Sequence, residues 1–185
     1  MKEQIPPILR PDHVVPVSLK AFAEHFALPI IGDVATIELN GISMNTGDLR
    51  PGDLFVAMPG KKTHGANFVG KALELGAVAL VTDQAGIDQL GELPIPVLRL
   101  ENPRTKLGEL AAFVYGNIPG NMPKLFATTG TNGKTSTSYL LEGILRQMGE
   151  CTGLTSTAER HIAGEVIVSR LTTPESPDRK STRLN

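Results

Sequence analysis

The sequence predicts an α/β protein with a mostly parallel sheet, in two units along the chain. Short apolar runs bounded by Gly, Pro and Asp alternate with stretches of helical periodicity, as expected where helices join parallel strands. The apolar share of 41% is that of a globular protein. Residues 116–123, rich in Gly and Pro, separate two such blocks and are a predicted hinge.

The first block contains three predicted strands, each an apolar run between turn residues: 53–58, 77–82 and 96–100. Ser18 is a predicted N-cap for a helix with one apolar face, formed by Leu19, Phe22, Ala23 and Phe26. A second helix is expected over residues 68–75. It should end at Gly76, because glycine readily adopts the left-handed conformation that closes many helices.

Another helix should begin at Asn102-Pro103, since proline fits the first helical position. After the hinge we expect a strand over 125–128, a glycine turn and a helix. One side of that helix carries apolar residues: Leu140, Leu141, Ile144, Leu145 and Met148. A last strand over 153–156 follows Gly149.

Composition argues against several classes of function. The formal net charge is −1, aromatic residues make up 4% and there is no Trp, so no nucleic-acid surface is expected. No apolar stretch is long enough to span a membrane, and the first residues lack the apolar stretch of a signal peptide. The single cysteine, Cys151, excludes an internal disulfide and is expected in the core. We therefore expect a cytoplasmic protein without membrane insertion.

The most informative segment is Thr129-Gly130-Thr131-Asn132-Gly133-Lys134-Thr135-Ser136, between a predicted strand and a predicted helix. Its glycines let backbone N–H groups approach phosphate oxygens, and the helix directs its unpaired N–H groups to the same point. The Lys134 ammonium would neutralise the outer phosphates of ATP, and the Thr135 hydroxyl would bind Mg²⁺. The alternative is an ordinary strand-to-helix turn, because Thr128 stands where the general P-loop pattern has glycine.

Three segments in order along the chain carry a family resemblance: 50–60 with His64-Gly65, the loop 130–135, and Leu171-Thr172-Thr173-Pro174-Glu175. Together they resemble the Mur ligases. The first is similar to their uridine-binding N-terminal domain. The second has the form of their ATP loop, which tolerates a residue other than glycine at the position of Thr128. The third resembles the substrate-binding segment of the MurE type, which acts on UDP-N-acetylmuramoyl-L-alanyl-D-glutamate.

The resemblance implies an ATP- and Mg²⁺-dependent ligase of peptidoglycan synthesis, acting as a monomer. It would join the third amino acid to UDP-N-acetylmuramoyl-dipeptide through an acyl phosphate. It implies a UDP-substrate-binding domain over 1–100 and, over 101–177, the beginning of a P-loop ATPase domain with a mostly parallel sheet. The further metal ligands, a carbamylated lysine and the amino-acid-binding domain of the family would lie beyond residue 177. The chain alone is therefore expected to be inactive.

The resemblance also assigns roles to single residues. ATP would be bound by Gly130, Thr131, Asn132, Gly133, Lys134, Thr135 and Ser136. Among them, Lys134 would have the catalytic role, and Thr135 would bind the metal. Thr172 and Thr173 would bind the muramoyl-dipeptide. The uridine would lie near Met44 and Thr46, where the family commonly has Asp-Ser-Arg. Thr46 keeps a hydroxyl, but Gly47 stands in place of the arginine.

Several alternatives remain open. Residues 43–48 fit a simple polar turn as well as a uridine site. A MurF-type or folylpolyglutamate synthase-like ligase shares part of the pattern, although Thr172-Thr173-Pro174 argues against both. A non-catalytic nucleotide-binding module would bind ATP and ignore the muramoyl substrate. Residues 178–185 resemble a translated sequencing-library adapter, so a non-native tail is expected, with a natural basic tail as the alternative.

Other polar residues are expected to be ordinary surface groups. The four histidines, His13, His25, His64 and His161, show no metal-ligand spacing. Asp83 and Asp88 have no evident partner and are expected on a solvated surface. The sequence does not say which amino acid is added, because the domain that would select it lies beyond the matched segments.

Overall fold

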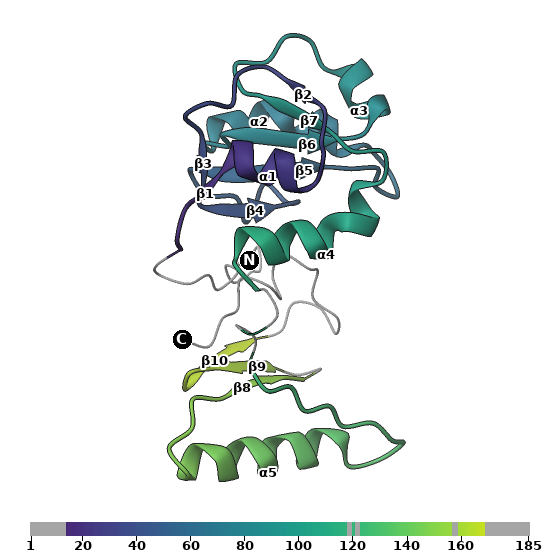
Figure 1. Ribbon diagram of the computed structural model, residues 1–185. Helices are drawn as coiled ribbons and strands as arrows, with labels where there is room; N and C mark the ends of the chain where they lie inside the picture. Colours follow the sequence, from purple (N-terminus) through teal and green to yellow (C-terminus); the bar gives the residue numbers. More distant parts are fainter. Residues whose placement is uncertain (1–13, 118–119, 121–122, 157–158, 169–185) are drawn as a thin grey trace. The chain divides into compact units, whose positions relative to one another are not determined.

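The computed structural model (Figure 1) describes residues 14–117, 120, 123–156 and 159–168. The chain divides into two compact units, whose described residues lie within 12–118 and 119–185. This division falls inside the predicted hinge, 116–123. The expected domain boundary at residue 100 lies earlier in the chain, before helix α4 (Pro103–Val114). That helix belongs to the first unit, because its buried residues join the core of that unit's sheet.

A five-stranded sheet forms the centre of the first unit, in the order β2-β7-β6-β5-β4. The strands are β2 (Ile30–Ile31), β4 (Gly41–Ser43), β5 (Asp53–Ala57), β6 (Ala79–Thr82) and β7 (Val97–Arg99). From β4 to β7 the neighbours are parallel, and β2 joins the edge antiparallel. The mostly parallel α/β fold is thus confirmed, with the three predicted strands as β5, β6 and β7. The short strands β2 and β4 were not predicted.

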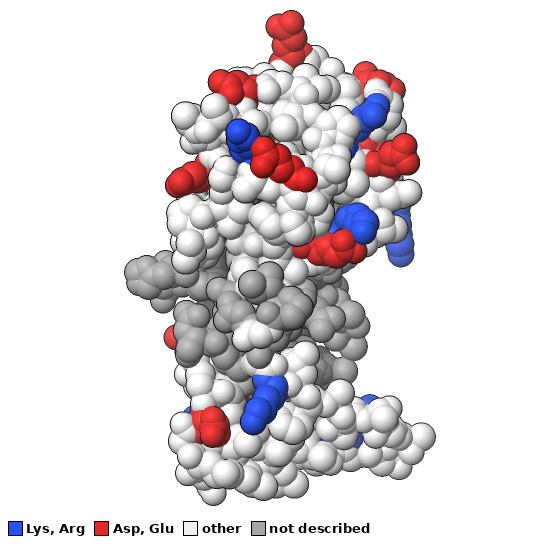
Figure 2. Space-filling view, in the orientation of Figure 1, with Lys and Arg blue, Asp and Glu red and all other residues white. Residues whose placement is uncertain are grey.

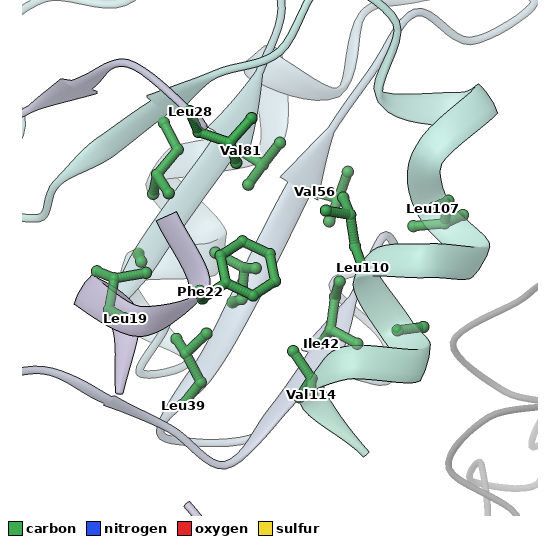
Figure 3. Close-up of a cluster of buried hydrophobic side chains, with 14 of the residues drawn as sticks. Leu19, Phe22, Leu28, Leu39, Ile42, Val56, Val81, Leu107, Leu110 and Val114 are labelled. Carbon is green, nitrogen blue, oxygen red and sulfur yellow. The ribbon is translucent and has the colours of Figure 1, made fainter. Parts of the chain in front are cut away.

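Helices cover both faces of this sheet. On one face, α1 (Leu19–His25) and α4 pack in a large apolar cluster that includes Phe22, Val56 and Leu110 (Figure 3). On the other, α2 (Val69–Glu74) packs in a second cluster with Phe55, and α3 (Gln84–Gln89) contributes at its border. Because successive side chains of a strand point to opposite faces, a strand covered on both faces must be apolar throughout, as β5 nearly is.

The helix ends follow the local sequence. Ser18 is the N-cap of α1 and accepts a hydrogen bond from Ala21 N at 3.5 Å, as predicted. Asn102 is the N-cap of α4, with Pro103 at its start. Gly76 follows α2 with φ of 88°, the left-handed conformation that its sequence position indicates. A small antiparallel pair, β1 (Val17–Ser18) with β3 (Glu38–Leu39), completes the unit.

The second unit contains α5 (Lys134–Gln147) and an antiparallel sheet in the order β10-β9-β8. Its strands are β8 (Gly153–Thr155), β9 (Glu159–Ile162) and β10 (Glu165–Val168). The predicted helix and the strand at 153–155 are confirmed. The predicted strand over 125–128 is wrong, because no described strand lies alongside to pair with it, and Leu125 and Phe126 are exposed. Cys151 is also exposed, not in the core.

Surface charge is mixed on the face shown in Figure 2, where acidic and basic side chains alternate over the first unit. This mixture agrees with the formal net charge of −1. Within the described part of the chain, no helix has the length and apolar character needed to cross a membrane.

Candidate functional site

The glycine turn before α5 has the backbone geometry of an anion site. Gly130 and Gly133 have φ of 137° and 75°, values that residues with a Cβ rarely adopt. A Cβ at either glycine would meet no atom closer than 3.8 Å, so conformation, not space, requires glycine here. Gly133 is the N-cap of α5, and no described side chain caps the helix. The first N–H groups of α5 are therefore available to a phosphate.

The Lys134 side chain is held over this turn. Its Nζ donates to the carbonyl oxygen of Gly130 at 2.6 Å and to that of Thr131 at 3.3 Å. An ammonium has three N–H donors, so one remains for a phosphate oxygen. Thr135 and Ser136 lie exposed in the first turn of α5. Backbone N–H groups, a cation and a hydroxyl thus converge at one end of the helix, the combination that a triphosphate needs.

A second candidate region is the edge of the five-stranded sheet where the parallel strands β4 to β7 end. Ligands of open α/β sheets bind at this edge, because loops from several strands meet there. The turn at residues 43–48 follows β4, the loop through His64 follows β5, and Asp83 follows β6. Lys61 and Lys62 are exposed in the middle loop.

At this edge His64 and Asp83 form a nearly buried pair. His64 Nε2 lies 3.1 Å from Asp83 Oδ1, and the two side chains are 10% and 13% exposed. His64 Nδ1 accepts from Ala66 N at 3.0 Å, so in a neutral ring the proton is on Nε2, which donates to Asp83. Asp83 also accepts from Gly86 N at 2.8 Å. The expectation that Asp83 is a solvated surface group is therefore wrong.

The sequence contained only an indirect signal for this pair. His64-Gly65 stood in the family pattern without a role of its own. A Cβ at Gly65 would lie 2.7 Å from Met58 N and 2.8 Å from Ala57 Cα, both backbone atoms. This close approach brings the His64 loop against the end of β5. The placement of Asp88 on the exposed surface, where it accepts from Gln84 Nε2, is as predicted.

Replacing Asp83 with alanine is expected to destabilise the first unit by about 1–3 kcal/mol. The change removes the N-cap of α3 and leaves the His64 donor nearly buried without its acceptor. Urea unfolding followed by circular dichroism measures the difference. Asp88→Ala, the same change on the exposed side of α3, is the control and should alter stability by less than about 0.5 kcal/mol. Equal effects of the two changes would contradict a structural role for the pair.

The predicted uridine residues lie in the turn after β4. Met44 is half-buried and packs against the larger apolar cluster, and Thr46 is half-buried at the start of the turn. Asn45 Oδ1 accepts from Gly47 N at 3.0 Å, and Asn45 Nδ2 donates to Asp48 Oδ2 at 3.2 Å. These contacts form a polar turn at the ligand-binding edge of the sheet, so both interpretations of residues 43–48 remain open.

Thr172, Thr173 and residues 178–185 lie outside the described residues. Among the described residues, no group of three or more His, Cys, Asp or Glu side chains could hold a metal ion. The Thr135 hydroxyl, exposed at the start of α5, therefore remains the candidate protein ligand for Mg²⁺. A single hydroxyl fits this role, because Mg²⁺ in phosphate sites takes most of its ligands from phosphates and water.

Two family models match segments of this chain. Residues 34–115 match the family model described as Mur ligase family, catalytic domain, and residues 128–184 match the Mur ligase middle domain. The chain belongs to the Mur ligase family. The first match covers the four parallel strands β4 to β7 and helix α4, but not the edge strand β2, and the second covers the glycine turn and α5.

This Mur ligase chain is 43% identical over 173 residues to the UDP-N-acetylmuramyl-tripeptide synthetase of Leifsonia xyli, covering 94% of the chain and 34% of the relative. It is 48% identical over 141 residues to the UDP-N-acetylmuramoyl-L-alanyl-D-glutamate–2,6-diaminopimelate ligase of Streptomyces avermitilis, covering 76% and 28%. The chain thus spans about a third of the length of the curated relatives it matches.

Two solved structures are similar in fold. A UDP-N-acetylmuramoyl-L-alanyl-D-glutamate–2,6-diaminopimelate ligase matches with a TM-score of 0.63 and 21% identity, over 91% of this Mur ligase chain and 33% of that protein. MurF from Acinetobacter baumannii matches with a TM-score of 0.56 and 23% identity, over 73% and 28%. At these identities the likeness concerns the fold alone.

Proposed function

We propose that this chain is part of an ATP-dependent ligase of peptidoglycan synthesis, which adds the third amino acid to UDP-N-acetylmuramoyl-L-alanyl-D-glutamate. The observation that carries the proposal is the convergence of Gly130, Gly133 and Lys134 at the start of α5. The names of the relatives that are 43% and 48% identical support the MurE reaction. The MurF alternative is supported by a likeness of fold to MurF from Acinetobacter baumannii at 23% identity.

The proposed reaction has two steps. The glutamyl carboxylate of the substrate attacks the γ-phosphorus of ATP, which forms an acyl phosphate and releases ADP. The amine of the incoming amino acid then attacks the acyl carbon, which forms the amide and releases phosphate and a proton. In the first step Lys134 and the N–H groups of residues 130–135 would hold and neutralise the phosphates in line with the carboxylate. Mg²⁺, held in part by Thr135 Oγ1, would supply further charge neutralisation when bound.

The nucleotide end of the muramoyl substrate would lie at the carboxyl edge of the first unit's sheet, beside Met44 and Thr46. Its dipeptide would lie near Thr172 and Thr173. We assign the UDP-substrate to the unit within 12–118 and ATP to the unit within 119–185. Because ATP and the UDP-linked substrate are cytoplasmic, the enzyme would act in the cytoplasm, and we propose that it does so as a monomer.

Isothermal calorimetry with three ligands tests this proposal. We expect the chain to bind ATP in the presence of Mg²⁺ and to bind UDP-N-acetylmuramoyl-dipeptide more tightly than the corresponding tripeptide. Preference for the tripeptide would indicate the MurF type, and binding of ATP alone would indicate a non-catalytic nucleotide-binding module. We expect no amide product from the 185-residue chain alone, and its formation would show that no further domain is needed.

A further inference from the structure

A polar cluster links α5 to β9 at a distance from the glycine turn. His161 Nδ1 lies 2.6 Å from Glu142 Oε2, and His161 Nε2 lies 3.1 Å from Glu159 Oε1. Tyr139 OH donates to the same Glu159 oxygen at 2.7 Å, and its ring meets the imidazole edge-on, with centroids 5.2 Å apart. Tyr139 and Glu142 belong to the helix, whereas Glu159 and His161 belong to the strand. We name these four residues the His161 cluster.

The contacts of His161 favour a protonated ring. Both ring nitrogens face carboxylate oxygens, and only the imidazolium can donate from both. Burial by itself lowers the pKa of His161, but the hydrogen bonds to Glu142 and Glu159 outweigh it and raise the pKa above its ordinary value. Glu142 is only 7% exposed, and its second oxygen, Oε1, has no partner among the described atoms. His161 is therefore the described partner of the buried Glu142 carboxyl group.

This cluster also holds the orientation of α5. Glu142 is the buried residue of that helix, whereas the apolar side chains of Leu140, Ile144 and Met148 are exposed. Leu141 and Leu145 are half-buried, so apolar packing and the polar contacts of Tyr139 and Glu142 together set the rotation of α5 about its axis. A rotation would carry the side chains of Lys134 and Thr135, at the start of α5 and about 12 Å along the axis from Glu142, around the helix axis.

We propose that His161, bound between Glu142 and Glu159, is a positioning residue for the nucleotide loop. As imidazolium it bridges helix and strand and fixes α5 in the rotation that directs the loop at the phosphates. The inference rests on the proposed binding of ATP at residues 130–136. It adds a residue on β9, far along the chain from the loop, that acts on the nucleotide through α5 without touching it.

The described groups that face the imidazole come from two elements. Tyr139 and Glu142 approach from α5, and Glu159 approaches from β9 itself. The cross-strand partners of His161, Leu154 in β8 and Val166 in β10, carry no ionisable group. The bridge is complete below the raised pKa of His161 and is lost as the pH rises through it. ATP affinity should fall over the same range.

The first test is calorimetry of ATP binding from about pH 6 to pH 9, with the wild-type chain, His161→Gln and Glu142→Gln. At the acid end we expect both variants to bind ATP about 5- to 30-fold more weakly than the wild type. The difference should shrink as the pH rises, because the wild type loses its bridge. His25→Gln, a histidine change in the other unit, is the matched control and should follow the wild-type profile.

The second test uses the wild-type chain and needs no folded variant at position 161. Because linkage is reciprocal, saturating ATP should raise the pKa of His161, followed by NMR of its ring protons. The ring signals of His25, assigned with the His25→Gln chain, should not shift. An unchanged pKa of His161 in a chain that binds ATP would overturn this inference alone, as would wild-type affinity in both variants. Absence of ATP binding by the wild type at every pH would overturn the proposed function as well.

Discussion

Replacing Lys134 with alanine is expected to weaken ATP binding by about 10- to 100-fold, the largest functional effect of a single change in the described chain. The ammonium is the cation that contacts the glycine turn, and its two bonds to loop carbonyls place its third N–H for a phosphate oxygen. Truncation removes a charge-assisted hydrogen bond and leaves the phosphates to backbone dipoles alone. Calorimetric titration with ATP and Mg²⁺ measures the loss.

The stability of the chain should hardly change in this variant, because the Lys134 side chain is exposed. Lys106→Ala removes the same charge from α4 in the other unit, where Lys106 pairs with Glu109 at the surface. That control should bind ATP as the wild type does, because an exposed ion pair contributes little to the stability of the fold. ATP affinity in Lys134→Ala equal to that of the control would exclude the turn as the phosphate site.

Replacing Phe22 with alanine is expected to lower the free energy of unfolding of the first unit by about 3–5 kcal/mol. This is the largest effect on stability among the predicted substitutions. Its ring is fully buried in the apolar cluster between α1 and the sheet (Figure 3). It lies tilted against Phe26 and edge-on to Phe113, with ring centroids 5.1 Å and 5.8 Å away. Removal leaves a cavity that neighbouring helices cannot close without breaking their own contacts. The free energy of unfolding of a small domain is about 5–15 kcal/mol in total, so the variant should lose a large part of its stability.

Urea unfolding followed by circular dichroism determines this loss. Phe68→Ala is the control, because it makes the same substitution at an exposed position. Phe68 lies at the end of the short helix η1 (Gly65–Phe68) and is 45% exposed. Its truncation should cost less than about 1 kcal/mol. A loss in Phe22→Ala as small as that in the control would mean that α1 does not stabilise the sheet.

Local sequence was enough to predict the features that depend on few neighbours. The N-cap Ser18, the helix start at Asn102-Pro103 and the end of α2 at Gly76 each follow from the backbone preferences of one or two residues. The strands β5 and β6 were evident because a strand covered on both faces must be apolar throughout. The glycine turn could be identified as well, since its chemistry resides in contiguous residues. Strands of two residues, such as β2, carry too little pattern to be found.

Tertiary structure alone decided the features that need distant partners. Residues 125–128 have the composition of a strand, but a strand exists only where a neighbour supplies its hydrogen bonds. His64 and Asp83 are 19 residues apart, as are Glu142 and His161, and each pair forms because separate elements of the fold bring the side chains together. Sequence determines the chemical groups and their local backbone. The burial that places the Glu142 carboxyl group against His161 arises only when helix and strand have packed.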